Sequence, residues 1–328
     1  MVKNLIRKGA HKTLELAGLK YYQKPQKLRC GYTVVVKNIS EKVGSYTVIL
    51  PVPLESESQK IISQPEFRPE PDFVSDKAEN NFALWKVELA PKHSASFNQY
   101  FEVERSPISV KINPAFTLDS YMGSKEGKKY LKKTQSLKSS KTRALAKEIV
   151  YGERVESTGE EKSLALLIPK IYEYVAKKLH YGDPIEGLYS VEDALGLERV
   201  DCGGFSTLFI AICQELGIPA RLVSGFWAKQ SDRVPSMHAW AESMLPDGSW
   251  VPADISTEIL RKQGRSSKFA SLGKIGSDRV VFSHGCDIEL QADKKKIKTE
   301  ILQNPIVIAE NKSEQAHIEI EFSTKRET

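Results

Sequence analysis

Three residues in the second half of the chain have side chains that together could carry out nucleophilic catalysis. The first is Cys202, in the sequence VDCGGFS, immediately before a stretch with a helical pattern. At the start of a helix, unpaired backbone N–H groups and the positive end of the helix dipole favour a thiolate over a thiol. We therefore predict that Cys202 is a nucleophile. Gly203 and Gly204 are expected to leave room beside its sulfur for the backbone of a substrate.

The other two residues are His238, which begins a predicted strand at 238–245, and Asp254, near the end of the next predicted strand at 249–255. The sequence PDG at 246–248 predicts a tight turn between these strands. In such a hairpin His238 and Asp254 lie nearly opposite each other, close enough for a hydrogen bond if they share a face. A cysteine, a histidine base and a carboxylate that orients the base form a catalytic triad.

The elements that must position this triad are predicted by apolar periodicity. A helix at about 203–216 precedes a strand at 220–227, and Gly217 and Pro219 end the helix. Further helices are expected near 141–150 and from 160 to 179. The helix that follows Cys202 has an apolar stripe that we expect to be buried, made of Phe205, Phe209, Ile212 and Leu216.

Three blocks of this region resemble the transglutaminase-like superfamily, whose members are papain-related cysteine enzymes. The blocks are VDCGGFSTLFIAICQELGIPARLVSGF, HAWAE and GSWVPADIS, and they follow one another in the family's order within residues 200–256. The resemblance implies an α+β fold with a papain-like core, in which a helix carrying the cysteine packs on an antiparallel sheet. It also implies that Cys202 is the nucleophile, His238 the base and Asp254 the orienting acid. Nothing in the sequence resembles the calcium-binding loops of the animal transglutaminases, so no calcium dependence is expected.

The resemblance further implies a reaction, in which the cysteine attacks an amide of a protein or peptide and forms a thioester. The acyl group then passes to an amine or to water. The oxyanion hole would use the Cys202 N–H and a second donor, for which Tyr181 is the candidate. Trp240 is expected in the core or at the wall of the cleft. Glu242 is expected either to tune the site or to form a surface ion pair. The alternative function is a module that binds peptides without turnover.

Residues 28–112 have the pattern of a small all-β domain. A hairpin is predicted between strands at 32–36 and 46–50, a loop at 60–73, and strands at 80–89 and 96–112. We assign residues 1–122 to an N-terminal β-sandwich domain. PVPLESESQ and NNFALWKVELAP resemble the sandwich that precedes the core in bacterial members of the superfamily.

The charge of the chain is concentrated in one segment. The 328 residues include 48 Lys and Arg against 42 Asp and Glu, giving a net charge of +6, yet residues 123–150 alone contain nine Lys or Arg and two Glu. The rest of the chain is therefore almost neutral. We interpret 123–150 as a solvated basic connector with a first helix, followed by a catalytic domain at 151–328 that includes the C-terminal strands. Docking to an acidic partner, nucleic acid or a membrane surface is the less favoured interpretation of this charge, and no nucleic acid is expected.

The remaining chemistry-bearing residues do not predict a second site. Cys30, Cys213 and Cys286 are isolated, and no CxxC pair is present, so no disulfide framework or zinc site is expected. Ser283, His284 and Cys286 offer too few ligands for a metal. No cofactor is expected. No apolar segment has the length of a signal peptide or of a membrane span, so we expect a cytoplasmic protein.

Overall fold

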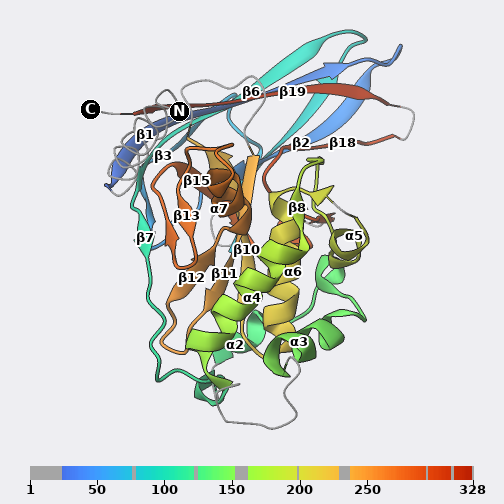
Figure 1. Cartoon of the computed structure of the whole chain (residues 1–328). Coiled ribbons are helices and arrows are strands. Elements are labelled where there is room, and N and C mark those ends of the chain that lie inside the picture. The colour runs from blue at the N-terminus through green and yellow to red at the C-terminus, as the bar shows by residue number, and fades with distance from the viewer. Residues whose placement is uncertain are drawn as a thin grey trace, which may run out of the picture. The chain divides into compact units, whose positions relative to one another are not determined.

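A computed structural model describes residues 24–75, 79–121, 125–151, 162–197, 199–228, 237–292, 295–311 and 314–326 (Figure 1). The chain divides into two compact units, each built from separate stretches. The described part of unit 1 comes mainly from Ser106–Leu222 and Ala239–Ser277. Unit 2 comprises Gln26–Arg105, Val223–His238 and Asp278–Thr328.

Unit 2 contains two four-stranded antiparallel sheets that form a sandwich. The first has the order β19-β1-β6-β3, with β19 (Ala316–Arg326), β1 (Gln26–Asn38), β6 (Ser94–Arg105) and β3 (Gln59–Arg68). The second has the order β18-β2-β5-β4, with β18 (Ile306–Ala309), β2 (Gly44–Val52), β5 (Asn81–Leu89) and β4 (Phe73–Ser75). A separate hairpin pairs β16 (Ile288–Ala292) with β17 (Lys295–Thr299).

The sandwich core follows from the alternating burial of its strands. Along β1 every second residue from Leu28 to Val36 is buried, as expected for a strand with one face toward a core. Tyr32 lies at the centre of this core, where its ring meets those of Phe226, Phe282 and Phe322 at centroid distances of 5.4 to 5.8 Å. The predicted all-β sandwich is thereby confirmed.

Several details of the predicted β domain are wrong. β1 and β2 do not form a hairpin, because they belong to different sheets and the chain passes from one sheet to the other between them. The expected loop at 60–73 contains strand β3, in which Pro65 is tolerated because β3 is an edge strand. The C-terminal strands do not complete the catalytic domain at 151–328, since β19 pairs with β1 and β18 with β2. The domain boundary predicted at residue 122 falls within 122–124, which lie outside the described residues.

Unit 1 is built around helix α6 (Cys202–Glu215), which is buried along its whole length from Gly203 to Gln214. The sequence predicted a single apolar stripe, but the helix is surrounded by other elements and is therefore apolar nearly all round. The expected helices near 141–150 and from 160 to 179 are present as α3 and α4. The helices of the unit are α2 (Lys125–Lys129), α3 (Thr142–Tyr151), α4 (Leu164–Lys178), α5 (Val191–Gly196), α6, α7 (Ile255–Lys262), and the short 3-10 helices η1 (Leu118–Tyr121) and η2 (Gln135–Leu137).

A further four-stranded sheet has the order β12-β11-β10-β15. Its members are β10 (Ala220–Trp227), β11 (Met237–Met244), β12 (Trp250–Ala253) and β15 (Arg279–His284). The predicted hairpin is confirmed, because β11 pairs with β12 from Met244↔Trp250 to Ala241↔Ala253. In this register Asp254 follows the last paired residue of β12. The shorter sheets pair β8 (His180–Tyr181) with β9 (Arg199–Val200), and order β13 (Ala270–Ser271), β14 (Lys274–Ile275) and β7 (Ile108–Ser109) as β13-β14-β7.

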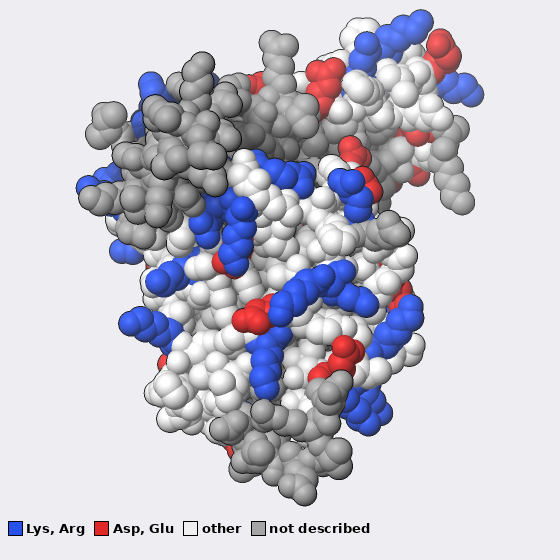
Figure 2. All heavy atoms as spheres, viewed as in Figure 1, with Lys and Arg blue, Asp and Glu red and all other residues white. Residues whose placement is uncertain are grey.

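The basic segment is not simply a solvated linker. The amide of Gln214 on α6 donates to the Tyr130 carbonyl at 2.8 Å, so the segment is hydrogen-bonded to the central helix. Lys133 and Arg143 both pair with Glu215, at the end of α6. On the face seen in Figure 2, basic side chains are interspersed with acidic ones. No helix in the described part of the chain is long and apolar enough to cross a membrane.

Candidate active site

Helix α6 begins at Cys202 because the preceding residue is an effective N-cap. Asp201 Oδ1 accepts hydrogen bonds from the backbone N–H groups of Gly203 at 2.8 Å and Gly204 at 3.4 Å. Its Oδ2 accepts from the N–H of Ile185 at 3.2 Å. A carboxylate at a helix N-terminus is favoured by the orphan donors and the dipole. The carboxylate of Asp201 thus accepts hydrogen bonds from N–H groups that were predicted to favour a thiolate at Cys202.

The Cys202 sulfur lies at the junction of α6 and β11. The backbone N–H groups of Ala239 and Gly203 lower its pKa. Burial outweighs them and, together with the nearby carboxylates of Asp201 and Asp254, raises the pKa of Cys202 to about 12. The predicted resting thiolate is therefore wrong, because removal of the sulfur from water and the N-cap carboxylate oppose the dipole.

The glycines after Cys202 have a packing role rather than the predicted role in substrate access. A Cβ atom added at Gly204 would lie 2.6 Å from the Cβ of Val200 on β9. One added at Gly203 would lie 3.0 Å from the Leu188 side chain. Both glycines are buried. They allow α6 to approach its neighbours closely, and they do not border open space.

Asp254 is placed by the same local device as Asp201. It is the N-cap of α7, and its Oδ1 accepts from the N–H of Thr257 at 3.2 Å and from the hydroxyl of Ser256 at 3.4 Å. Its side chain is buried, and its charge raises the pKa of Cys202, so the two groups interact electrostatically within unit 1. The acid therefore precedes a helix instead of continuing β12.

His238 is the second residue of β11 and directly precedes Ala239, the residue whose N–H lowers the pKa of Cys202. Its backbone carbonyl accepts from the side-chain amide of Gln303 at 3.1 Å. Its imidazole stacks on the indole of Trp227, with ring centroids 4.2 Å apart and planes 24° from parallel. This stack was not predicted from the sequence. The available signal was a Trp at the end of the strand that precedes the histidine strand.

Tyr181, the proposed second oxyanion donor, lies on β8, where it pairs with Val200, two residues before Cys202. Burial raises the pKa of Tyr181 to about 12, with further contributions from Cys202 and Asp201, so its hydroxyl remains protonated at neutral pH. Arg265 lies over the ring of Tyr181 at 5.8 Å from the centroid. Tyr181 is thus a neutral hydroxyl in the electrostatic surroundings of Cys202. Its role as an oxyanion donor remains a prediction.

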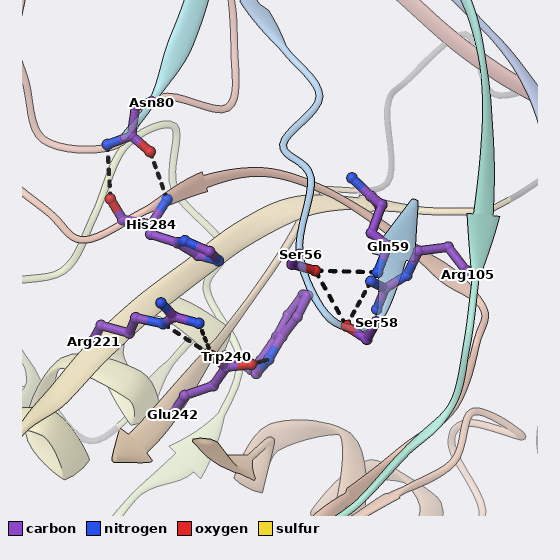
Figure 3. Close-up of polar contacts among 9 residues, drawn as sticks. All are labelled: Ser56, Ser58, Gln59, Asn80, Arg105, Arg221, Trp240, Glu242 and His284. Carbon is purple, nitrogen blue, oxygen red and sulfur yellow. Dashed lines mark hydrogen bonds and ion pairs between the residues drawn. The ribbon is translucent and has the colours of Figure 1, made fainter. Parts of the chain in front are cut away.

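Trp240 and Glu242 belong to a buried network within unit 1. Arg221 donates to Glu242 Oε2 through Nε at 3.0 Å and Nη2 at 2.8 Å, and the Trp240 indole N–H reaches Glu242 Oε1 at 3.4 Å (Figure 3). Only 6% of the Glu242 side chain is exposed, so the ion pair is buried and not at the surface as predicted. Trp240 is 1% exposed and packs in the core, which does not fit a wall of the cleft. The guanidinium of Arg221 also lies 3.8 Å from the centroid of Trp250.

The other cysteines and the S-H-G-C string are placed apart from this chemistry. Cys30, Cys213 and Cys286 are buried, whereas Cys202 is partly accessible. His284 is fixed through its backbone, which exchanges two hydrogen bonds with the Asn80 side chain (Figure 3). In the ranges that the structure describes, no three His, Cys, Asp or Glu side chains are grouped so that they could hold a metal ion.

Comparisons with known proteins show what this chain is similar to. Residues 143–255 match the model of the transglutaminase-like superfamily. A solved structure from Cytophaga hutchinsonii, described as a candidate cysteine protease, is 16% identical with a TM-score of 0.55, and the match covers 92% of this chain and 98% of that one. The two therefore share a fold. The periplasmic domain of TgpA from Pseudomonas aeruginosa also matches, at 12% identity with a TM-score of 0.35, over 75% of this chain and 92% of that one. A search of curated proteins gives no significant match.

Proposed function

Because residues 143–255 match the model of the transglutaminase-like superfamily, we propose that this protein is a cysteine enzyme that cleaves or transfers amides of proteins or peptides. Cys202 is the nucleophile, His238 the base and Asp254 the acid that orients it. One observation supports the proposal: the backbone N–H of Ala239, the residue next to His238, and the charge of Asp254 both act on the pKa of Cys202.

The raised pKa of Cys202 shapes the first step. Because the sulfur rests as a thiol, His238 must accept its proton as the sulfur attacks the carbonyl carbon of the substrate. The carbonyl π bond opens to an oxyanion. At the first position of α6, the Cys202 N–H has no helical partner and is free to stabilise that charge. Tyr181 is the proposed second donor.

The remaining steps return the enzyme to its starting state. The oxyanion collapses and breaks the C–N bond, and the imidazolium of His238 gives its proton to the departing amine. A thioester on Cys202 remains. An amine or a water molecule then attacks the thioester, His238 takes a proton from this attacker, and the sulfur leaves and regains that proton. The acyl group ends on an amine or as a free acid.

Competition between the cysteines tests the assignment of Cys202 and His238. A small excess of iodoacetamide, followed by peptide mapping, should modify Cys202 well before Cys30, Cys213 and Cys286. The greater solvent exposure of Cys202 would by itself produce the same order of modification. His238→Ala must therefore slow the modification of Cys202, whereas the matched control His284→Ala must not. Equal rates in the two variants would contradict His238 as the base.

A second experiment separates transfer from hydrolysis and tests turnover itself. Incorporation of a labelled primary amine into a glutamine-rich protein is measured beside cleavage of a peptide library. Cys202→Ala should abolish whichever activity is found, whereas Cys213→Ala should retain it. If no substrate in either assay is converted in a Cys202-dependent way, the protein is a binding module that kept the scaffold.

A further inference from the structure

Three flat side chains of unit 2 form a column across three neighbouring strands. The Arg279 guanidinium lies 4.4 Å from the centroid of the Trp227 ring, and the imidazole of His238 stacks on Trp227 at 4.2 Å. Arg279 is on β15, Trp227 on β10 and His238 on β11, and these strands are adjacent in the sheet. Trp227 and Arg279 are direct register partners. Side chains opposite each other on one face of a sheet are natural contact pairs.

Arg279 contributes to this column mainly through the packing of its planar guanidinium, because its charge is balanced by a neighbouring carboxylate. Both it and its neighbour Asp278 are fully buried, and Asp278 Oδ1 accepts from the Nε and Nη2 of Arg279 at 3.3 Å each. The carboxylate therefore balances the guanidinium charge, as a buried cation requires. A planar guanidinium stacks well on an aromatic face.

The column is anchored at both ends by hydrogen bonds to the backbone. On β15, the N–H of Val281 donates to Gln59 Oε1 at 2.9 Å, and Gln59 Nε2 returns a bond to the Val281 carbonyl at 2.8 Å. On β11, Gln303 holds the His238 carbonyl, and Tyr32 donates to the Gln303 carbonyl at 3.0 Å. The sandwich core thus fixes the backbones between which the three side chains stack.

We propose that Trp227 is the positioning residue for His238. Its indole, backed by Arg279, sets the plane of the imidazole and so directs the ring nitrogens. A stacked ring can slide or tilt only by losing its contact with the indole, which restricts the histidine to one orientation. The indole face also attracts a cation, so the stack remains favourable when His238 carries the extra proton. The proposal deepens the proposed function, in which His238 is the base.

The chain offers a matched control for this role. Trp250 is also stacked on an arginine, Arg221, at 3.8 Å, but that pair lies in unit 1 and includes no histidine. Trp227→Leu and Trp250→Leu each remove an indole from an arginine, so both should lower the melting temperature. Only Trp227→Leu should affect His238. Trp227→Phe retains an aromatic face and provides a milder variant should the leucine variant fail to fold.

The test combines a spectroscopic and a kinetic measurement on the full chain. In histidine-labelled protein, with His238→Gln used for assignment, the ring protons of His238 should resonate upfield because of the indole ring current. Trp227→Leu should abolish that upfield shift, and Trp250→Leu should preserve it. With a substrate from the assays above, kcat of Trp227→Leu should fall about 10- to 100-fold, with KM changed less than about twofold. Trp227→Phe should recover most of kcat.

The outcomes separate this inference from the proposed function. If the His238 resonances of Trp227→Leu match those of the wild type, the positioning role is wrong. A kcat that falls no more in Trp227→Leu than in Trp250→Leu also overturns it, since that is the result of general destabilisation. Absence of any Cys202-dependent turnover contradicts the proposed function, while the resonances still decide whether Trp227 orients His238.

Discussion

The two ends of helix α6 differ in what surrounds a cysteine. At the N-terminal end, two backbone N–H groups lower the pKa of Cys202, and the carboxylates of Asp201 and Asp254 raise it. Near the C-terminal end, burial raises the pKa of Cys213. Beyond Cys213, Glu215 is held by Lys133 and Arg143. Position at a helix start is thus only one part of what prepares a cysteine for chemistry.

The difference shows how one helix can serve both function and stability. Its N-terminal end is surrounded by polar groups that act on a sulfur, and its C-terminal end by groups that fix the basic segment. Burial is common to both ends and disfavours a thiolate at both. Substitutions at the first end should therefore change reactivity most, and those at the second end should change stability alone.

The largest contrast is expected from alanine substitutions of two glycines. Gly204→Ala places a Cβ 2.6 Å from that of Val200, so α6 must shift and carry Cys202 with it. Turnover should fall about 100-fold for a displacement of about 1 Å, and overpacking should cost about 1–3 kcal/mol of unfolding free energy. Gly217→Ala, at φ +81° with open space around it, should cost about 1–2 kcal/mol and leave turnover unchanged. Denaturant titrations and kcat measurements check both, and equal turnover in the two variants would contradict the contrast.

The second contrast concerns the pH dependence of Cys202. Asp201 raises the pKa of the thiol, so Asp201→Asn, which keeps the capping oxygen, should lower it. The rate of alkylation by iodoacetamide should then rise at lower pH than in the wild type. Each unit of decrease in pKa raises the thiolate fraction about tenfold at a fixed pH. Glu215→Gln, at the other end of α6, should leave the profile in place. A profile that moves to higher pH in Asp201→Asn is incompatible with the described electrostatics.

The smallest effect should come from Glu215 itself. Ion pairs with Lys133 and Arg143 lower the pKa of this carboxyl, and 13% of its side chain is exposed. A lowered folded-state pKa means that the stabilisation is present above the unfolded value of about 4.3 and is lost as the pH falls through the folded value. Glu215→Gln should therefore cost about 1 kcal/mol at pH 7 and progressively less as the pH falls below about 4.3. Urea titrations at pH 7 and at a pH below about 4.3 measure this. A cost that is the same at both would exclude the ion pairs as its source.

Much of the local structure could be predicted from the sequence because it depends on neighbouring residues. The strand at 220–227, the hairpin around 246–248 and the helix that begins at Cys202 follow from periodicity and from turn or stop residues. The N-cap role of Asp201 could also have been found, since an Asp directly before a predicted helix is a common cap. Strand β3 could not be predicted in the same way, because Pro65 within it is a loop signal, although an edge strand tolerates a proline.

By itself, the sequence determined the order of the three chemical blocks, the identity of Cys202, His238 and Asp254 as candidates, and an α+β core preceded by a sandwich. Only the tertiary structure decided the partners of β1 and β2, the return of the C-terminal strands to the sandwich and the column beneath His238. These depend on contacts between residues far apart in the chain, such as Arg279 with Trp227. The protonation of Cys202 was also decided by the tertiary structure. Its pKa depends on burial and on Ala239 and Asp254, which the fold brings to the start of α6.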